Sequence, residues 1–521
     1  MAAPRLRLVL TILLLGAGEF ACSGRRFGPP DILIVSVDTL PADHVGAYGH
    51  AAARTPNIDA LAREGTLFRQ ATTPFPRTTP GLASLLTGLW AHHHGSREVG
   101  RSIDNVPTLG SVLAANGYEA RGISANGSAG RSQGLDRGFA PFIDPSDFNS
   151  WRAENTTKRA LTLLSGANRE KPLLFWVHYV DPHYPYEPPR GFKDQPPAEQ
   201  CHKLLAMQLH REISLTEVRR DWHRVASRAL ADCQGLYDAE IAYVDAEIGQ
   251  LLAAWRKARG RGSVVVFTSD HGENFGEDGL FFEHGPNVYD AAMRVPLIVA
   301  GAGPRGRVDE GVARLEDVMP TLLSLAQLPR ERWPAVDGVD LSARLAGASA
   351  ASEGEATAFV ESGSEMLVDS YHRLRSGSSF KEHCVNLERF SLCEGGGRPE
   401  ALYDHAADPG REHDVSARHP EELKRLRAVA ERWPYDETRQ RAIRTSRFKL
   451  IEVPAEAGYE TRLYDLAADP GETRNVITDH QALAARLRSA LDTWAAGTPG
   501  KGTKLHTPEQ IETLRALGYV E

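Results

Sequence analysis

The chain has 521 residues, 41% of them hydrophobic and 25% charged, and its 60 Lys and Arg against 68 Asp and Glu give a net charge of -8. This length suits one large domain plus a smaller one, and the composition is that of an ordinary globular protein. A mildly acidic chain without a long basic run argues against non-specific nucleic-acid binding, so no nucleic-acid partner is expected.

The first residues have the pattern of an export signal. Arg5 and Arg7 precede the apolar run at 8–18, and the small-residue stretch EFACSG follows at 19–24. A basic start, a short apolar run and small residues are typical of a signal peptide, which we assign to residues 1–22. The apolar run is too short for a comfortable transmembrane helix.

The cysteine inside this segment resembles a bacterial lipoprotein cleavage site. Cys22 follows Ala21 and precedes Ser23 and Gly24, although Glu19 stands where leucine is usual. Lipidation of Cys22, which would anchor the chain to a membrane, is preferred over simple cleavage. In both cases we expect an exported protein that is periplasmic or associated with the outer membrane or cell surface.

The other four cysteines form two pairs that are close in sequence, Cys201 with Cys233 and Cys384 with Cys393. An oxidising compartment favours two disulfides with these partners. None of the spacings resembles a zinc site.

Continuous apolar strands alternate with helical stretches in the first two thirds of the chain. Strands are expected at 31–37, 173–180, 263–269 and 295–301. Helices are expected at 58–65, 82–88, 106–117 and 229–260. This alternation indicates a mostly parallel α/β sheet covered by helices on both faces, here over residues 30–345. Ligands of such sheets bind at the carboxyl ends of the strands.

The composition changes after about residue 345, where LAGASAASEGEAT (345–357) has the small residues of a linker. Beyond it, ALYDHAADPGREHDV (401–415) matches RLYDLAADPGETRNV (462–476), and each copy precedes a helical stretch that ends in Trp. Asp-Pro-Gly is turn chemistry, and two copies are too few for a solenoid. We expect residues 346–521 to form a smaller α+β domain in which this unit is duplicated for packing.

Acidic and histidine residues follow three of the expected strands. They are Asp38 after the first, His178, Asp181 and His183 at the end of the second, and Asp270 and His271 after the third. A single Asp after a strand often only caps the next helix. Three such strand ends meet at one edge of a parallel sheet, and carboxylate with imidazole suits a divalent cation, so a metal site is expected there.

Five ordered blocks of the chain form a recognisable pattern: DILIVSVDTLPADHVGAYG (31–49), TPNIDALAREGTLF (55–68), LLTGLWAHHHG (85–95), FTSDHGENFGE (267–277) and RVPLIVAG (294–301). In this order they closely resemble the sulfatase family of the alkaline phosphatase superfamily. LYDLAADPGETRNV (463–476) resembles the family's C-terminal signature. Five blocks in order are far more specific than one short motif. The resemblance implies a large α/β domain followed by a smaller domain with an antiparallel sheet and a helix.

The resemblance also implies roles for five residues. Asp38, Asp270 and His271 fall on metal-ligand positions, which implies one divalent ion, Ca²⁺, Mn²⁺ or Zn²⁺. His183 and His284 fall where the family holds the non-bridging oxygens of the ester and protonates the leaving group. His284 lies near the position where many sulfatases have a lysine.

The nucleophile position departs from the family pattern. That pattern is Cys or Ser, any residue, Pro, any residue and Arg, and it ends in Leu-Thr-Gly. Alignment on Thr87 and Gly88 places Thr78 in the nucleophile position and Pro80 in the proline position, whereas Leu82 replaces the arginine.

A threonine changes the chemistry that is expected. Sulfatases oxidise Cys or Ser to formylglycine, whereas oxidation of Thr78 would give a ketone, so no formylglycine is expected. Phosphodiesterases and phosphoglycerol or phosphoethanolamine transferases among the relatives use a threonine directly. Metal coordination can activate the hydroxyl of Thr78, and amides at the start of its helix would favour an anionic ester. The alternatives are that Thr78 is only the helix N-cap, or that Thr79 is the nucleophile.

Two further positions differ from the usual pattern. Thr39 stands where sulfatases have the second of two paired aspartates. Asn126, in RGISANGSAG, stands where formylglycine sulfatases tend to have Lys-Trp-His. An amide N–H can hold a phosphoryl oxygen, so Asn126 is expected to bind substrate.

The remaining polar candidates are expected to lie outside the chemistry. His92 and His94 fit the family's His-x-His-Gly pattern and are expected to be structural or to support site residues from behind. His178 is expected in the core. Glu273 and Asp278 are expected to be solvated loop charges, and the alternative is that they are extra metal ligands.

One alternative concerns a second ion. Asp181, His183 and His284 could bind it, as in two-metal relatives. Substrate binding by this group is preferred, so one ion is expected.

Together these features predict an exported, metal-dependent hydrolase of sulfate or phosphate esters with Thr78 as nucleophile. The threonine favours phosphate over the family's sulfate esters. The alternatives are a phosphodiesterase or phosphotransferase acting on phosphate diesters, and a non-catalytic member of the fold that binds an anion. The ester, whether a small molecule, glycan or lipid, and the oligomeric state are left open.

Overall fold

A computed structural model describes residues 28–497 apart from 100, 146–149, 190–195, 197, 210–214, 261, 278–280, 350–355, 364–374, 380–381, 388, 396–397, 405–406, 409–412 and 433–438. The expected signal peptide (1–22) and Cys22 lie outside these residues. No helix of the described part is both long and apolar enough to cross a membrane.

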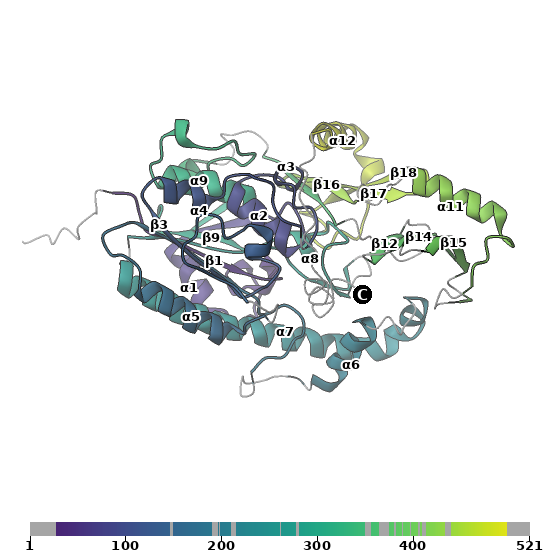
Figure 1. Ribbon diagram of the computed structural model, residues 1–521, viewed down its shortest axis with the longest axis horizontal. Helices are drawn as coiled ribbons and strands as arrows, with labels where there is room; N and C mark the ends of the chain where they lie inside the picture. Colours follow the sequence, from purple (N-terminus) through teal and green to yellow (C-terminus); the bar gives the residue numbers. More distant parts are fainter. Residues whose placement is uncertain are drawn as a thin grey trace, which may run out of the picture.

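An eight-stranded, mostly parallel sheet forms the centre of the larger domain (Figure 1). In spatial order its strands are β10 (Arg307–Arg314), β2 (Gly65–Thr72), β9 (Leu297–Ala300), β6 (Val264–Ser269), β1 (Ile32–Val37), β5 (Leu173–Tyr179), β3 (Glu119–Ser124) and β4 (Phe142–Ile143). The central strand β1 pairs in parallel with β5 and β6, and β5 pairs in parallel with β3. The carboxyl ends of these four strands therefore share one edge of the sheet.

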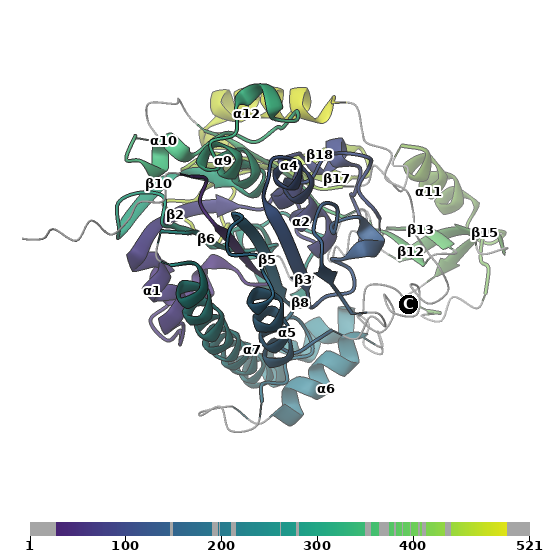
Figure 2. The same cartoon turned by 60° about the vertical axis from the view of Figure 1, so that its left-hand side comes forward.

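Helices cover both faces of this sheet (Figures 1 and 2). One face packs on α1 (Pro56–Glu64), α5 (Ala153–Ser165) and α7 (Leu215–Arg259), and the other on α2 (Thr78–Thr87), α4 (Leu109–Ala115) and α9 (Val318–Leu325). Alternate residues of β1 enter the two cores, with Leu33 and Val35 on the α7 side and Ile32 and Ile34 on the α2 side. Burial on both faces explains why the strand is continuously apolar.

The strand expected at 295–301 is present as β9, but it runs antiparallel to both neighbours, β2 and β6. The segment between β6 and β9 contains the short hairpin of β7 (Asn274–Phe275) and β8 (Phe281–Glu283) and the four-residue helix α8 (Asp290–Met293). A parallel pairing needs a crossover that returns the chain to the amino edge. This segment makes no such crossover among its described residues, so β9 runs back through the sheet.

The smaller domain contains two antiparallel sheets of four strands each. One consists of β11 (Ala358–Glu361), β16 (Arg441–Arg444), β17 (Phe448–Ala455) and β18 (Gly458–Asp465), and the other of β12 (Arg375–Ser379), β13 (Glu382–Leu387), β14 (Phe390–Gly395) and β15 (Arg398–Asp404). Helix α12 (Gln481–Ala495) packs on the first sheet and α11 (Pro420–Arg432) on the second.

The described residues of the repeated sequence unit make an equivalent backbone hydrogen bond in both copies. Val415 N donates to Leu402 O at 2.7 Å, and the equivalent Val476 N donates to Leu463 O at 2.8 Å. In each copy the strand, β15 or β18, is followed by a turn and then by the helix that packs on its sheet. In both copies, therefore, the described residues connect a strand to the helix that packs on its sheet.

Helix α6 (Ala198–Leu209) is joined to α7 by a disulfide between Cys201 and Cys233, which confirms the first expected pair. Cys384 and Cys393 lie opposite each other in the register of β13 and β14, and Cys393 is disulfide-bonded. The arrangement agrees with the second expected pair.

The smaller domain anchors a loop of the larger one. Lys449 Nζ lies 2.8 Å from Asp290 Oδ1, and Arg444 donates to the other oxygen of the same carboxylate at 3.1 Å. Asp290 opens α8, and the loop before α8 includes His284 and Gly285, whose carbonyl accepts from Gly363 N at 2.8 Å. Contacts from the second domain therefore fix the loop that bears His284.

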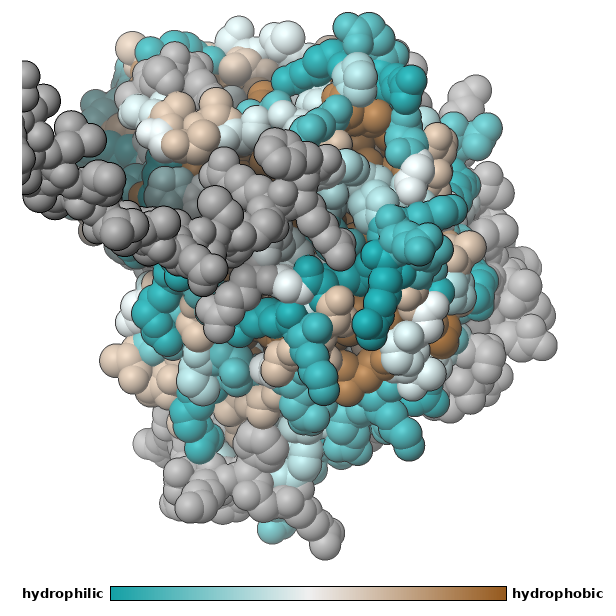
Figure 3. Space-filling model, turned by 90° about the vertical axis from the view of Figure 1, so that its left-hand side faces the viewer, coloured by the Kyte–Doolittle hydropathy of each residue, from teal (hydrophilic) through white to brown (hydrophobic). Residues whose placement is uncertain are grey.

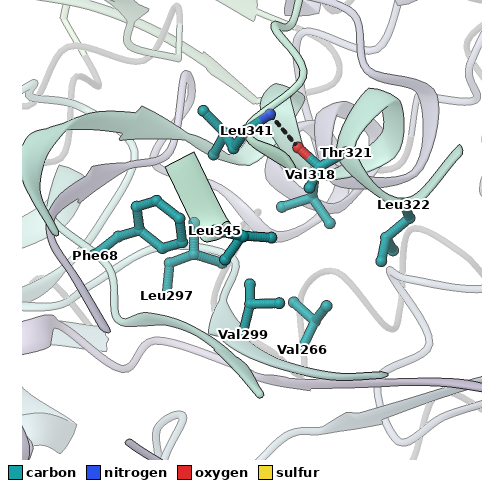
Figure 4. A pocket seen from close by; sticks show the side chains of 9 residues that line it. All are labelled: Phe68, Val266, Leu297, Val299, Val318, Thr321, Leu322, Leu341 and Leu345. Carbon is teal, nitrogen blue, oxygen red and sulfur yellow. Dashed lines mark hydrogen bonds between the residues drawn. The ribbon is translucent and has the colours of Figure 1, made fainter. Parts of the chain in front are cut away.

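A small pocket lies between the sheet and helices α9 and α10 (Ser342–Leu345), as Figure 4 shows. Its lining consists of Phe68, Val266, Leu297, Val299, Val318, Thr321, Leu322, Leu341 and Leu345. The hydroxyl of Thr321 accepts from Leu341 N at 2.8 Å, so the polar atom in this lining is already bonded. No charged residue and none of the expected site residues line the pocket, so we regard it as a packing gap in the core.

On the face drawn in Figure 3, hydrophilic side chains predominate and hydrophobic ones emerge in small separate areas.

Candidate active site

The shared carboxyl edge of β1, β6, β5 and β3 brings the expected site residues together. Asp38 follows β1, and Asp270 and His271 follow β6. His183 lies beyond the end of β5, and Asn126 lies two residues after β3. The strand order thus converts residues that are far apart in sequence into one cluster.

Asp38, Asp270 and His271 form a group suited to a metal ion. Their side chains are fully buried, and one ligand atom of each lies within 4.8 Å of the others. His271 Nε2 lies 3.6 Å from Asp38 Oδ1 and 3.6 Å from Asp270 Oδ2. Within the described part of the chain, this is the one group of three acidic, histidine or cysteine residues that meets this spacing.

Hydrogen bonds on the outer atoms orient all three ligand atoms inward. His271 Nδ1 donates to Gly272 O at 2.9 Å, which leaves the lone pair on Nε2. Asp270 Oδ1 accepts from the backbone amides of Thr39 at 3.1 Å and His271 at 2.8 Å. Asp38 Oδ2 accepts from Asn126 Nδ2 at 2.6 Å. The other two carboxylate oxygens, Asp38 Oδ1 and Asp270 Oδ2, have no hydrogen-bond partner among the described residues.

The electrostatics of this group match a cation site. Burial, together with the charge of Asp38, raises the pKa of Asp270 well above its usual value. Burial would also raise the pKa of Asp38, but the charges and hydrogen bonding of His183, His178 and His271 hold that pKa below its usual value. Two buried carboxylates with inward-facing oxygens repel each other, and a divalent ion with oxygen and imidazole ligands fits the donor set.

Thr78 lies at this group. Its buried Oγ1 is 3.3 Å from His271 Nε2. Thr78 is the first residue of α2, whose N-cap is Arg77, so the alternative that Thr78 is the N-cap is wrong. The helix start can approach the Asp270 loop because residue 81 is glycine: a Cβ there would lie 2.6 Å from the Asp270 carbonyl oxygen.

Thr79 faces a different partner. Its Oγ1 donates to Ser128 O at 2.6 Å. The two adjacent threonines therefore differ in surroundings, and Thr78 is the one that contacts the candidate metal group.

His183 and His284 stand beside the group, as expected. The rings of His271 and His284 stack with centroids 4.3 Å apart, and those of His183 and His284 meet at 5.3 Å. His183 Nδ1 donates to Tyr184 O at 2.8 Å. Burial, the charge of His183 and the charge of Arg77 lower the pKa of His284.

Glu273 is part of the site, so the expectation that it is a solvated loop charge is wrong. Its side chain is buried because the chain turns inward directly after the ligand loop. Glu273 Oε1 lies 3.2 Å from His284 Nδ1, and Oε2 accepts from Tyr186 OH at 3.2 Å. Burial raises the pKa of this carboxyl to about 8. In the sequence, the position of Glu273 two residues after the candidate ligand His271 was the feature that could have indicated a place in the site. Asp278 lies outside the described residues.

The remaining candidates lie outside the metal group. Asp181 Oδ1 is 3.7 Å from the Arg152 guanidinium, which lies equally close to Glu240. His94 Nε2 lies 3.1 Å from Ser84 Oγ, and His92 packs on the Trp494 ring at 4.9 Å.

Two residues lie beside the candidate site although the sequence analysis did not place them there. His178 is in the core, as expected, but its Nε2 lies 3.6 Å from Asp38 Oδ2. Arg77 is buried beside the His284 loop, since a Cβ on Gly285 would lie 2.4 Å from its Nε.

Comparison with known proteins adds a family model, described as Sulfatase, that matches residues 30–328. An uncharacterized sulfatase of Escherichia coli is 27% identical over 345 residues, which cover 58% of this chain and 68% of that protein. A Delta 4,5-hexuronate-2-O-sulfatase of Bacteroides thetaiotaomicron is 26% identical over 429 residues, which cover 74% of this chain and 84% of that protein.

Solved structures with the same fold include two phosphonate monoester hydrolases. The enzyme of Agrobacterium radiobacter superimposes with a TM-score of 0.61 at 22% identity, over 89% of this chain and 95% of its own. The enzyme of Silicibacter pomeroyi has a TM-score of 0.61 at 20% identity, over 91% and 96% of the two chains. At this identity the likeness concerns the fold.

Proposed function

This chain belongs to the sulfatase family, and we propose that it is a metal-dependent hydrolase of sulfate or phosphate esters that uses the unmodified hydroxyl of Thr78 as nucleophile. The observation that carries the proposal is the 3.3 Å contact between Thr78 Oγ1 and His271 Nε2, inside a buried group of carboxylates whose inner oxygens have no hydrogen-bond partner among the described residues. Asp38, Asp270 and His271 would hold the ion together with Thr78. A bound divalent ion would lower the pKa of the Thr78 hydroxyl and balance the charge of the ester.

The chain's own residues account for the first chemical step. Thr78 Oγ attacks the phosphorus or sulfur and releases its hydroxyl proton to solvent, a new bond to Oγ forms, and the bond to the ester oxygen breaks. The leaving oxygen takes its proton from His284 or His183, whose rings lie 5.3 Å apart at the candidate metal group. Water then hydrolyses the Thr78 ester and regenerates the hydroxyl.

The surrounding groups favour an anionic substrate. Thr78 opens the ten-residue helix α2, whose positive dipole end faces the site. Asn126 Oδ1 accepts from Ser128 N and Oγ at 2.9 and 2.8 Å, which fixes the amide orientation. One N–H of Asn126 then bonds Asp38, and the second is available for a substrate oxygen.

The ester class is tested by a substrate screen. Purified protein is assayed with an aryl sulfate, an aryl phosphate and an aryl phosphodiester, each with added Ca²⁺, Mn²⁺ or Zn²⁺. We expect turnover of at least one phosphate ester, because Thr78 cannot form the formylglycine of sulfate hydrolysis. Transfer to an added alcohol would favour the phosphotransferase alternative. Binding of phosphate or sulfate without product release from any of the esters would contradict the hydrolase and favour a non-catalytic member of the fold.

We further propose that the protein is exported. The disulfide between Cys201 and Cys233 supports an oxidising compartment. Fractionation of cells that express the full chain, with metabolic labelling by a fatty acid, would show whether Cys22 is lipidated or the signal is simply removed.

A further inference from the structure

Three side chains on the α2 face of the sheet form a buried polar row that ends at Asp38. Trp176 Nε1 donates to Ser36 Oγ at 3.0 Å, and Ser36 Oγ lies 3.0 Å from His178 Nδ1. His178 Nε2 in turn lies 3.6 Å from Asp38 Oδ2. All four side chains are fully buried.

The sheet itself dictates this alignment. Ser36 and His178 are direct partners in the register of β1 and β5. Trp176 precedes His178 by two residues, and Asp38 follows Ser36 by two, so all four side chains point to one face. The neighbours on this face are apolar, including Ile34 and Leu174. Polar groups in such surroundings destabilise the fold unless they are hydrogen-bonded.

The hydrogen-bond chemistry sets the direction of the row. An indole N–H can only donate, so Ser36 Oγ accepts from Trp176. The single proton of the Ser36 hydroxyl can then go to His178 Nδ1. This places the imidazole proton on Nε2, where it faces a carboxylate oxygen. The opposite tautomer would direct a lone pair at Asp38 Oδ2 and leave the Ser36 proton without an acceptor.

We propose that Trp176, Ser36 and His178 form a positioning relay that holds the Asp38 carboxylate with Oδ1 turned toward the metal ion. His178 and Asn126 both act on Oδ2, and Oδ1 is left for the ion. The 3.6 Å contact is long for a hydrogen bond, and such contacts tighten when a site is loaded. The inference rests on the proposed function in one respect, namely that a divalent ion binds at Asp38.

The relay predicts the metal affinity of variants at residue 178. His178→Leu fills a similar volume but removes the donor, so the dissociation constant for Mn²⁺ or Ca²⁺ should rise by about 10- to 100-fold, as for other groups that orient a metal ligand. His178→Gln keeps an N–H at the end of the side chain and should restore most of the affinity. Ser36→Ala removes the hydroxyl that fixes the tautomer of His178, so it should weaken metal binding by a smaller factor. Ile34→Val, on the same strand and face, is the matched packing control and should bind as the wild type does.

The measurement is isothermal titration calorimetry of the metal-stripped full chain with Mn²⁺ or Ca²⁺, and thermal unfolding of the metal-free variants reports their folding. If His178→Leu does not fold, Ser36→Ala carries the test. Wild-type affinity in a folded His178→Leu or Ser36→Ala variant would overturn the relay while leaving the proposed function intact. Wild-type protein that takes up no divalent ion would overturn the proposed function, and the relay with it. Equal weakening in Leu and Gln variants would show that residue 178 acts through packing, which also contradicts the relay.

Discussion

Thr78 Oγ1 and His271 Nε2 lie 3.3 Å apart, although 193 positions separate them in the chain. Thr78 opens α2, and His271 follows β6, so the contact exists only because the helix start and the strand end meet at one edge of the sheet. A hydroxyl at this distance from a candidate ligand atom is placed to share the same ion, which is the activation that a threonine nucleophile requires.

Replacement of the two adjacent threonines should separate the nucleophile from its neighbour. Thr78→Ala should lower kcat by at least about 1000-fold, because the groups that bind substrate provide only residual catalysis. Thr79→Ala removes a hydrogen bond to the Ser128 carbonyl, so it should cost about 1 kcal/mol of stability and leave kcat near the wild-type value. The rates are measured with the best substrate of the screen. The assignment fails if Thr79→Ala is the inactive variant and Thr78→Ala is not.

An added carboxylate at residue 39 should tighten metal binding. Thr39 adopts the left-handed φ of 54°, unusual for a β-branched residue, and its buried hydroxyl has no partner among the described residues. Asp tolerates this backbone better, and Thr39→Asp adds a third acidic group next to Asp38 and Asp270. The dissociation constant for Ca²⁺, measured by calorimetry, should fall by about tenfold or more, since ligand charge sets Ca²⁺ affinity. Thr39→Asn has the same shape without the charge, and equal affinity in both variants would contradict the explanation.

Divalent ions should stabilise the fold. Asp38 and Asp270 are buried close together, and one oxygen of each has no hydrogen-bond partner among the described residues, so a bound cation removes a repulsion. At about 100 times the dissociation constant, the ion should contribute about 2.7 kcal/mol, seen as a higher Tm in a thermal scan and reversed by a chelator. Asp270→Asn should lose most of this shift. Asp181→Asn, which changes an acidic residue outside the metal group, should keep it.

Asp181 should make stability pH-dependent. Burial raises the pKa of this carboxyl from 3.8 to about 6, despite the opposing charge of Arg152. The folded protein then holds the proton more tightly than the unfolded chain, so stability falls as the pH rises from about 4 through 6. Asp181→Asn should match the wild type at about pH 4 and exceed its free energy of unfolding by about 1–3 kcal/mol at about pH 7.5. Urea unfolding at both pH values measures this difference, and a constant offset would rule out the titration of Asp181 as its origin.

The apolar pocket of Figure 4 should accept one more methylene group. Val266 lines the pocket, so Val266→Ile should raise the free energy of unfolding by about 0.8 kcal/mol. Val264 is on the same strand and face but does not line the pocket, and Val264→Ile should destabilise by about 1–3 kcal/mol through overpacking. The pocket is not available space if both variants are destabilised alike in urea unfolding.

Local patterns predicted much of the architecture. The continuously apolar strands β1, β5 and β6 are buried on both faces, so their composition alone marked them as central. The antiparallel direction of β9 was not predictable in this way, because an apolar strand has the same composition in either direction. The reversal depends on the connection after β6, which stays at the carboxyl edge.

The candidate site, like the fold, could be predicted from the sequence only in part. The sequence by itself determined which residue types stand at the strand ends and the helix start: Asp38, Asp270 and His271 as candidate ligands, and Thr78 as the candidate nucleophile. Only the tertiary structure decided which oxygen of each carboxylate faces inward, that Glu273 is buried against His284, and that His178 directs its ring at Asp38. The reason is physical: a residue's chemistry is carried by its own side chain, but hydrogen-bond partners and burial come from strands that are neighbours in the sheet and distant in the chain.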